Sequence, residues 1–307
     1  MRSLGLSLAI SFFLIGLIPV AASAQGGLAI RVAELEAKVA ALEAILQFVH
    51  VDAERINGLA GPHWIFEGVN VHVRSGTGST HGPCPDDPDC ARRRGLGNLI
   101  VGYNEGFRSQ ARLRRGTHNL VVGPEHQYSN SGGFVAGSHN AVWGQGASVT
   151  GGFDNRANGE NASICGGEFN LASGTRSFVG GGRNGWARGD FSSVTGGSDN
   201  AAIGEFSSVS GGFKNDASGP RSSVSGGGNN DASGPRSSVS GGAKNEASGT
   251  NSSVSGGAGN DASALISSVS GGQSNEASAV AASVSGGSGR TAPANNNWVA
   301  GSLLEPN

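Results

Sequence analysis

This 307-residue chain is poor in charge, in aromatic side chains and in cysteine. Charged residues make up 14% of it and the formal net charge is -2, so no general attraction to nucleic acid or to an anionic membrane is expected. Three cysteines are too few to define a disulfide framework. Cys84 and Cys90 bracket a Pro-Asp-Asp-Pro-Asp segment and are candidates to close one small disulfide loop.

The common catalytic motifs are missing as well. The chain has no Gly-x-Ser-x-Gly nucleophile motif, no Walker phosphate loop and no Cys-x-x-Cys zinc pair. A polysaccharide-cleaving enzyme would need paired carboxylates in a groove, and no such cluster is evident in the sequence. We therefore expect a protein that is not an enzyme and that needs no cofactor.

Long apolar runs are confined to the amino terminus. Arg2 precedes an apolar run over residues 4–18, and Ala22-Ser23-Ala24 follows it. This layout predicts a cleavable secretory signal peptide over residues 1–24. A membrane-anchor helix is the alternative, but the run is short and a small-residue cleavage site follows. No later segment is apolar for long enough to cross a bilayer, so we expect an exported chain without a membrane span.

Residues 25–58 carry an apolar stripe with alternating steps of three and four. Its members are Leu28, Val32, Leu35, Val39, Leu42, Leu46, Val49, Ala53 and Ile56. The pattern predicts a parallel coiled-coil stalk, and the alternative is a single amphipathic helix packed on the rest of the chain. In the following neck, residues 59–95, Val69, Val71 and Val73 alternate with polar residues and predict a strand with one buried face.

Two arginine-rich loops flank the start of the next region. Their members are Arg92, Arg93, Arg94, Arg108, Arg112, Arg114 and Arg115. They are candidate contacts for a polyanion such as a polysaccharide or nucleic acid. The alternative, which we favour, is a pair of solvated loops, the first partly neutralised by neighbouring aspartates.

Glycine, by contrast, is abundant, with 54 residues, and much of it belongs to a repeat. A valine or isoleucine returns every fifteen residues, at Val149, Ile164, Val179, Val194, Val209, Val224, Val239, Val254, Val269 and Val284. Gly-Gly follows two and three residues after every one, and an alanine follows after eight. A fixed period indicates stacked units that bury their apolar positions against one another. We predict a parallel β-roll or β-solenoid with repeats of 14 to 15 residues over residues 96–290, closed by a cap over 291–307.

Two further columns of the repeat, and three early histidines, carry polar chemistry. An asparagine usually stands six residues after the valine and is expected to form a ladder that satisfies the turn backbone. Acidic residues share one position at Asp216, Asp231, Glu246, Asp261 and Glu276. Such a column could bind calcium collectively, although a solvated face is the simpler interpretation. His118, His126 and His139 fall in consecutive early repeats and could gather a metal, or could be solvated turn residues.

The apolar core of each repeat is thin, with one valine and one alanine, which favours further burial between chains. The unit also resembles a known family. Ser148-Val149-Thr150-Gly151 with Ala157 and Gly159, repeated through Ser283-Val284-Ser285-Gly286, is similar to the head repeats of trimeric autotransporter adhesins. The resemblance implies a left-handed roll of three chains on a bacterial surface. The heptads precede the head here instead of following it, and we do not expect the family's C-terminal membrane anchor.

The function predicted from these features is that of a secreted, adhesin-like protein. It would act as a homo-oligomer, with three chains as the resemblance implies, and bind a cell surface or an extracellular matrix component such as a glycan or a matrix protein. The alternative is a structural subunit of an extracellular fibre or surface layer. Nucleic acid is not an expected partner, because the chain lacks net positive charge.

Overall fold

The computed structural model describes residues 7–76, 80, 95–105 and 113–301. The chain divides into two compact units, residues 1–72 and 73–307, which are considered separately below. Cys84 and Cys90, and the arginines at 92, 93, 94, 108 and 112, lie outside the described residues.

The first unit begins with a single helix, α1 (Ser7–Leu46). From Leu28 onward its apolar side chains are exposed within the chain, as Leu35 (54% exposed) and Leu42 (56%) illustrate. Where the sequence predicts a coiled coil, the structure of the single chain therefore has one helix with an exposed apolar stripe. In the part of the sequence that the structure describes, no helix combines the length and apolarity needed to cross a membrane.

The helix ends earlier than the heptad pattern predicts. Val49 lies in β1 (Val49–Asp52), which pairs antiparallel with β2 (His63–Phe66), so the heptad assignments at Val49, Ala53 and Ile56 are wrong. An Asn-Gly turn explains the change, because Asn57 and Gly58 both have positive φ (52° and 84°) between the bridged residues Ile56 and Leu59. The strand predicted at residues 69–73 is wrong too, because these residues lie outside any strand.

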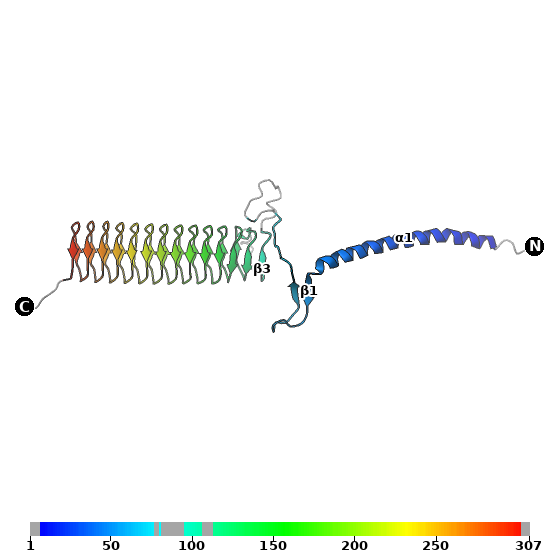
Figure 1. Cartoon of the computed structure of the whole chain (residues 1–307), viewed down its shortest axis with the longest axis horizontal. Coiled ribbons are helices and arrows are strands. Elements are labelled where there is room, and N and C mark those ends of the chain that lie inside the picture. Colours follow the sequence, from blue (N-terminus) through cyan, green and yellow to red (C-terminus); the bar gives the residue numbers. More distant parts are fainter. Residues whose placement is uncertain (1–6, 77–79, 81–94, 106–112, 302–307) are drawn as a thin grey trace, which may run out of the picture. The chain divides into compact units, whose positions relative to one another are not determined.

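The second unit is a parallel β-solenoid, which confirms the predicted architecture (Figure 1). Strands of successive coils pair in register, so that Ser163 lies beside Ser148 and Ile164 beside Val149. The largest sheet has 14 strands: β3 (Leu99–Val101), β4 (Leu120–Val122), β6 (Phe134–Ala136), β8 (Ser148–Val149), β10 (Ser163–Ile164), β12 (Phe178–Val179), β14 (Ser193–Val194), β16 (Ser208–Val209), β18 (Ser223–Val224), β19 (Ser238–Val239), β21 (Ser253–Val254), β23 (Ser268–Val269), β25 (Ser283–Val284) and β27 (Trp298–Val299).

A second side of each coil forms two further sheets. The first has seven strands: β5 (Gln127–Tyr128), β7 (Ala141–Val142), β9 (Arg156–Ala157), β11 (Leu171–Ala172), β13 (Trp186–Ala187), β15 (Ala201–Ala202) and β17 (Asp216–Ala217). The second has four: β20 (Glu246–Ala247), β22 (Asp261–Ala262), β24 (Glu276–Ala277) and β26 (Thr291–Ala292). Asp231 joins the two through single bridges to Asp216 and Glu246. Because β26 and β27 continue these ladders, the segment expected as a cap from residue 291 begins with one more coil.

The core is a stack of small side chains. The ten valine and isoleucine side chains of the fifteen-residue column are 0–1% exposed, and the alanine column from Ala157 to Ala292 is fully buried. A serine column two residues before the valine, running from Ser177 to Ser267, is also buried (1% exposed), which the sequence pattern did not reveal. In the last of these, the hydroxyl of Ser267 donates to the Ala264 carbonyl at 2.7 Å.

Buried asparagines tie each coil to the next. The backbone N–H of Asn230 donates to Oδ1 of Asn215 at 3.1 Å. Nδ2 of Asn215 donates to the carbonyls of Gly211 (2.8 Å) and Gly227 (3.0 Å), one in its own coil and one in the next. The side-chain amide thus satisfies turn backbone groups that would otherwise be buried without partners.

Candidate functional site

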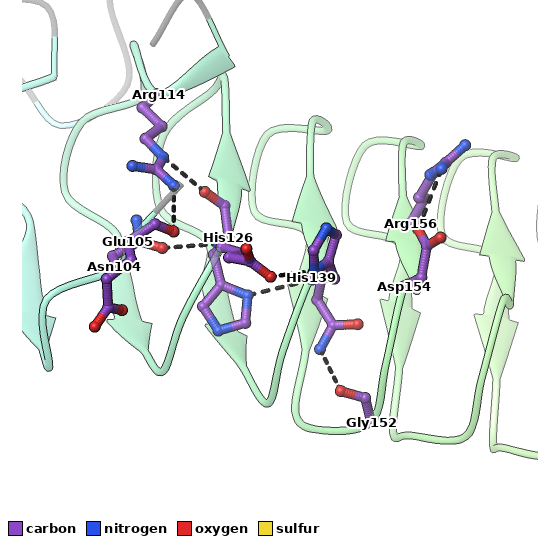
Figure 2. Close-up of polar contacts among 10 residues, drawn as sticks. Asn104, Glu105, Arg114, His126, His139, Gly152, Asp154 and Arg156 are labelled. Atoms are coloured by element: carbon purple, nitrogen blue, oxygen red, sulfur yellow. Dashed lines mark hydrogen bonds and ion pairs between the residues drawn. The ribbon is translucent and has the colours of Figure 1, made fainter. Parts of the chain in front are cut away.

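The arginines predicted to contact a polyanion are only partly within the described residues. Arg114 is half-buried, and its guanidinium donates to the backbone carbonyls of His126 (3.0 Å) and Glu105 (3.1 Å), as Figure 2 shows. The Arg114 guanidinium therefore bonds to the backbone of the first coils of the same chain. Arg115 is exposed.

The three early histidines occupy different environments. His126, labelled in Figure 2, is fully buried in the asparagine column. The N–H of Asn140 donates to its Nδ1 (3.3 Å), and its Nε2 lies 2.9 Å from the Val122 carbonyl. Because Nδ1 must accept and Nε2 must donate, His126 is the neutral Nε2–H tautomer. Burial is the main cause that lowers its pKa.

His118 and His139 have contacts of their own and form no cluster with His126. His139 has positive φ (60°) and pairs through Nδ1 with the carboxylate of Glu125. His118 accepts a hydrogen bond from the Ser75 backbone N–H at 3.3 Å. Within the described residues, no group of three or more His, Cys, Asp or Glu side chains is placed to hold a metal ion.

The acidic column stacks in register along the second side of the solenoid. Asp231 bridges to Asp216 and Glu246, and Asp261 pairs beside Glu246 and Glu276. Burial, followed by repulsion from the flanking carboxylates, raises the pKa of Asp231 and of Asp261 to about 6. The column therefore carries less negative charge in mildly acidic solution than its composition suggests.

Two faces of the solenoid differ in their chemistry. We call the outward residues of the 14-stranded sheet the uncharged face, because none of these residues from Leu99 to Ala300 is charged. Most are serine or threonine, and the ends carry exposed apolar residues such as Leu99 (53%) and Trp298 (67%). The charged face comprises the outward residues of the seven-stranded and four-stranded sheets, where Arg156, Trp186, Arg188 and the acidic column lie.

Trp186 on the charged face separates two shallow hollows, each of about 240 Å³. The hollow on the N-terminal side is lined by Asp154, Arg156, Phe169, Asn170, Leu171, Asn184, Trp186 and Arg188. The hollow on the C-terminal side is lined by Asn184, Trp186, Asp199, Ala201, Lys214, Asn215 and Asp216. We call the two together the Trp186 groove.

The polar side chains of the Trp186 groove are held in place by one another. Arg156 donates to Oδ1 of Asp154 at 3.1 Å (Figure 2), and both residues line the hollow on the N-terminal side. Asn184 donates to Oδ1 of Asp199 at 2.7 Å. This bond and a second one from Ser198 lower the pKa of Asp199. The guanidinium of Arg188 lies 4.2 Å from the centre of the Trp186 ring.

The groove coincides with the one break in the asparagine ladder. Gly185 stands where the other coils from Asn140 to Asn275 have asparagine, and its N–H donates to Oδ1 of Asn170 at 2.7 Å. With no side chain, Gly185 makes none of the amide bonds that the asparagines make. The sequence prediction did not identify this groove, although the loss of the repeat pattern at Gly185-Trp186 was a signal that pointed to it.

Comparison with known proteins does not assign the chain to a family. Neither a protein-family model nor a curated protein sequence matches it.

Proposed function

We propose that this protein is an exported, non-enzymatic, adhesin-like β-solenoid that works as a homo-oligomer and binds a component of a cell surface or extracellular matrix. The observation that supports the proposal is the contrast between the two faces of the solenoid. One face is uncharged along its whole length, and the other gathers aromatic and charged side chains in a groove. The first suits packing against identical chains, and the second suits recognition.

The uncharged face is the proposed contact between chains. Its serine and threonine side chains are small, so two such faces can approach closely without burying an unpaired charge. The exposed apolar residues at both ends of the face, including Leu99 and Trp298, would be covered in the oligomer. We infer three chains, the number that the resemblance to autotransporter head repeats implies.

Helix α1 supports the same proposal. Its stripe of leucine and valine is exposed in a single chain, and Val32, Leu35, Val39 and Leu42 have the spacing of a coiled-coil seam. Burial of this stripe against other copies would remove a continuous apolar surface from water. Association of the helices and of the solenoids would then reinforce each other.

The test of the oligomer is a matched pair of substitutions. Ser240→Arg places a charge on the uncharged face, whereas Ser248→Arg places one on the charged face, where a half-buried serine lies beside the acidic column. We expect the wild-type protein and Ser248→Arg to have the mass of a trimer by light scattering after size exclusion. Ser240→Arg should reduce that mass or weaken the assembly. A monomeric wild-type protein would contradict the proposal.

Adhesion is tested separately. The wild-type protein, immobilised on beads, should bind cells or matrix-coated surfaces, and beads coated with an unrelated protein serve as the control. Electron microscopy of the same preparation should show discrete particles. Long filaments without adhesion would support the alternative, a fibre subunit.

A further inference from the structure

The Trp186 groove combines features that point to one class of ligand. It lies on the charged face, away from the proposed contact between chains, so it would remain open to solvent in the oligomer. Its two hollows share Trp186 and Asn184 and continue each other along the solenoid. An extended ligand could therefore lie across several coils with Trp186 near its middle.

The charges of the groove balance. Arg156, Arg188 and Lys214 supply three positive groups, and Asp154, Asp199 and Asp216 supply three carboxyl groups. The two signs are interspersed, so neither a polyanion nor a polycation gains a continuous run of opposite charge. A ligand rich in hydroxyl groups can use both kinds of side chain, because each hydroxyl donates one hydrogen bond and accepts others.

The apolar part of the groove completes this chemistry. Trp186, Phe169 and Leu171 offer flat or aliphatic surface to the carbon–hydrogen face of a sugar ring. The polar groups around them are held by mutual contacts, such as Asn184 to Asp199 and Arg156 to Asp154, so little ordering is required when a ligand binds.

The interruption of the ladder supports a binding role for these coils. The outward position of Trp186 is filled in the later coils mainly by aspartate or glutamate, and the adjoining buried position by asparagine instead of Gly185. Here the chain gives up ladder hydrogen bonds and instead carries a large aromatic side chain beside two hollows. A departure from local consistency that costs stability is typical of functional positions.

We propose that the Trp186 groove binds a neutral, extended oligosaccharide, with Trp186 as the stacking platform and Asn184, Asp199 and Arg156 as hydrogen-bonding partners of its hydroxyl groups. This inference rests on the proposed adhesive function and names the ligand class for it. The shallow, open shape predicts weak binding at each groove, and the repetition of grooves in an oligomer would strengthen attachment to a multivalent surface.

The test uses the full-length protein and isothermal titration calorimetry with cellohexaose, maltohexaose, xylohexaose and hexa-N-acetylchitohexaose, and with heparin as the polyanion. We expect at least one neutral hexasaccharide to bind, with an affinity that changes less than about twofold between low and high salt, because no counterions are released. Trp186→Ala should weaken this binding at least about tenfold, the loss typical of an anchor residue.

Two further variants keep the outcome unambiguous. Trp64→Ala removes an exposed tryptophan from the other unit and should bind like wild type. Asp199→Asn removes one carboxylate but keeps a residue that tolerates the positive φ of 58° at this position, and should weaken binding severalfold with an unchanged circular dichroism spectrum.

The inference is overturned if none of the four neutral hexasaccharides binds, if Trp186→Ala binds as tightly as wild type, or if heparin alone binds with a steep salt dependence. It is also overturned if Trp186→Ala lowers the oligomer mass, because the groove would then belong to a contact between chains. If the wild-type protein adheres to cells or matrix and Trp186→Ala adheres equally well, the Trp186 groove is not the adhesive site, but the proposed adhesive function still holds.

Discussion

The two glycines of each Gly-Gly pair have different roles, and substitution of each by alanine should separate them. Gly212 has a φ of +88°, and a Cβ atom added there would lie 2.1 Å from the carbonyl oxygen of Gly227 in the next coil. Gly211, its neighbour, has no atom within 4 Å of an added Cβ. The second glycine therefore allows the coils to stack at their spacing, whereas the first has room for a methyl group.

We expect Gly212→Ala to destabilise the coil strongly. Left-handed backbone costs alanine about 1–2 kcal/mol. Relief of the contact with Gly227 requires a backbone shift, and overpacking of this kind costs about 1–3 kcal/mol more. The sum, about 2–5 kcal/mol, corresponds to an increase in local opening of roughly 30-fold to several thousand-fold. Gly211→Ala should change stability by no more than about 0.5 kcal/mol.

Hydrogen exchange followed by mass spectrometry is the assay, because the solenoid need not unfold as one cooperative unit. In Gly212→Ala, peptides around residues 205–230 should lose protection, and peptides near Val284 should keep more of it. Gly211→Ala should retain the wild-type pattern throughout. Equal protection in the two variants, or equal loss in both, would refute the stacking argument.

Three other perturbations test the polar core and the acidic column. Gly185→Asn should restore the ladder between Asn170 and Asn200 and stabilise these coils by about 1–2 kcal/mol, because each net hydrogen bond contributes about 1 kcal/mol. Hydrogen-exchange protection of the same coils measures this gain. No gain would mean that the ladder hydrogen bonds are energetically neutral. Because the pKa of Asp231 is raised to about 6, its carboxyl favours folding when protonated, so its contribution to stability is fully present below about pH 4 and is lost, with a fall in melting temperature, as the pH rises through 6. Asp231→Asn should reduce this fall in melting temperature and stabilise the protein at pH 7, and an unchanged pH profile would exclude the column as its source. The pKa of His126 is lowered, so its contribution to stability depends on pH in the opposite sense. Hydrogen-exchange protection of the first coils, corrected for intrinsic exchange, should decrease as the pH falls below about 6.5. His126→Asn should abolish this dependence, and a dependence that persists in the variant would assign it to another group.

Periodicity predicts the solenoid well because the same residue meets itself in the next coil. Val209 pairs beside Val194 and Val224, so a single column position repeats one environment along the whole stack. The buried asparagine column follows from the same argument. The buried serine column is harder to predict, because Ser207 and the exposed Ser210 are the same residue type, and only the path of the turn places one inside and the other outside.

The helix boundary shows where periodicity alone misleads. Val49, Ala53 and Ile56 continue the heptad spacing, but the Asn57-Gly58 turn stabilises a hairpin-like bend that a helix cannot include. The local turn chemistry decides the structure there, because β1 gains a partner in β2 that an isolated helix would lack.

The stacking of the coils can thus be predicted from the sequence alone. A constant period and small core residues leave one register in which valine covers valine, asparagine bonds to asparagine and the left-handed glycines lie over one another. The Trp186 groove cannot be predicted from the period in the same way. It depends on side chains from several coils, such as Arg156, Asn184 and Lys214, that come together only when the coils stack. The stacking of Arg188 on Trp186 has no counterpart in the other coils that the structure describes, so a periodic pattern does not predict it.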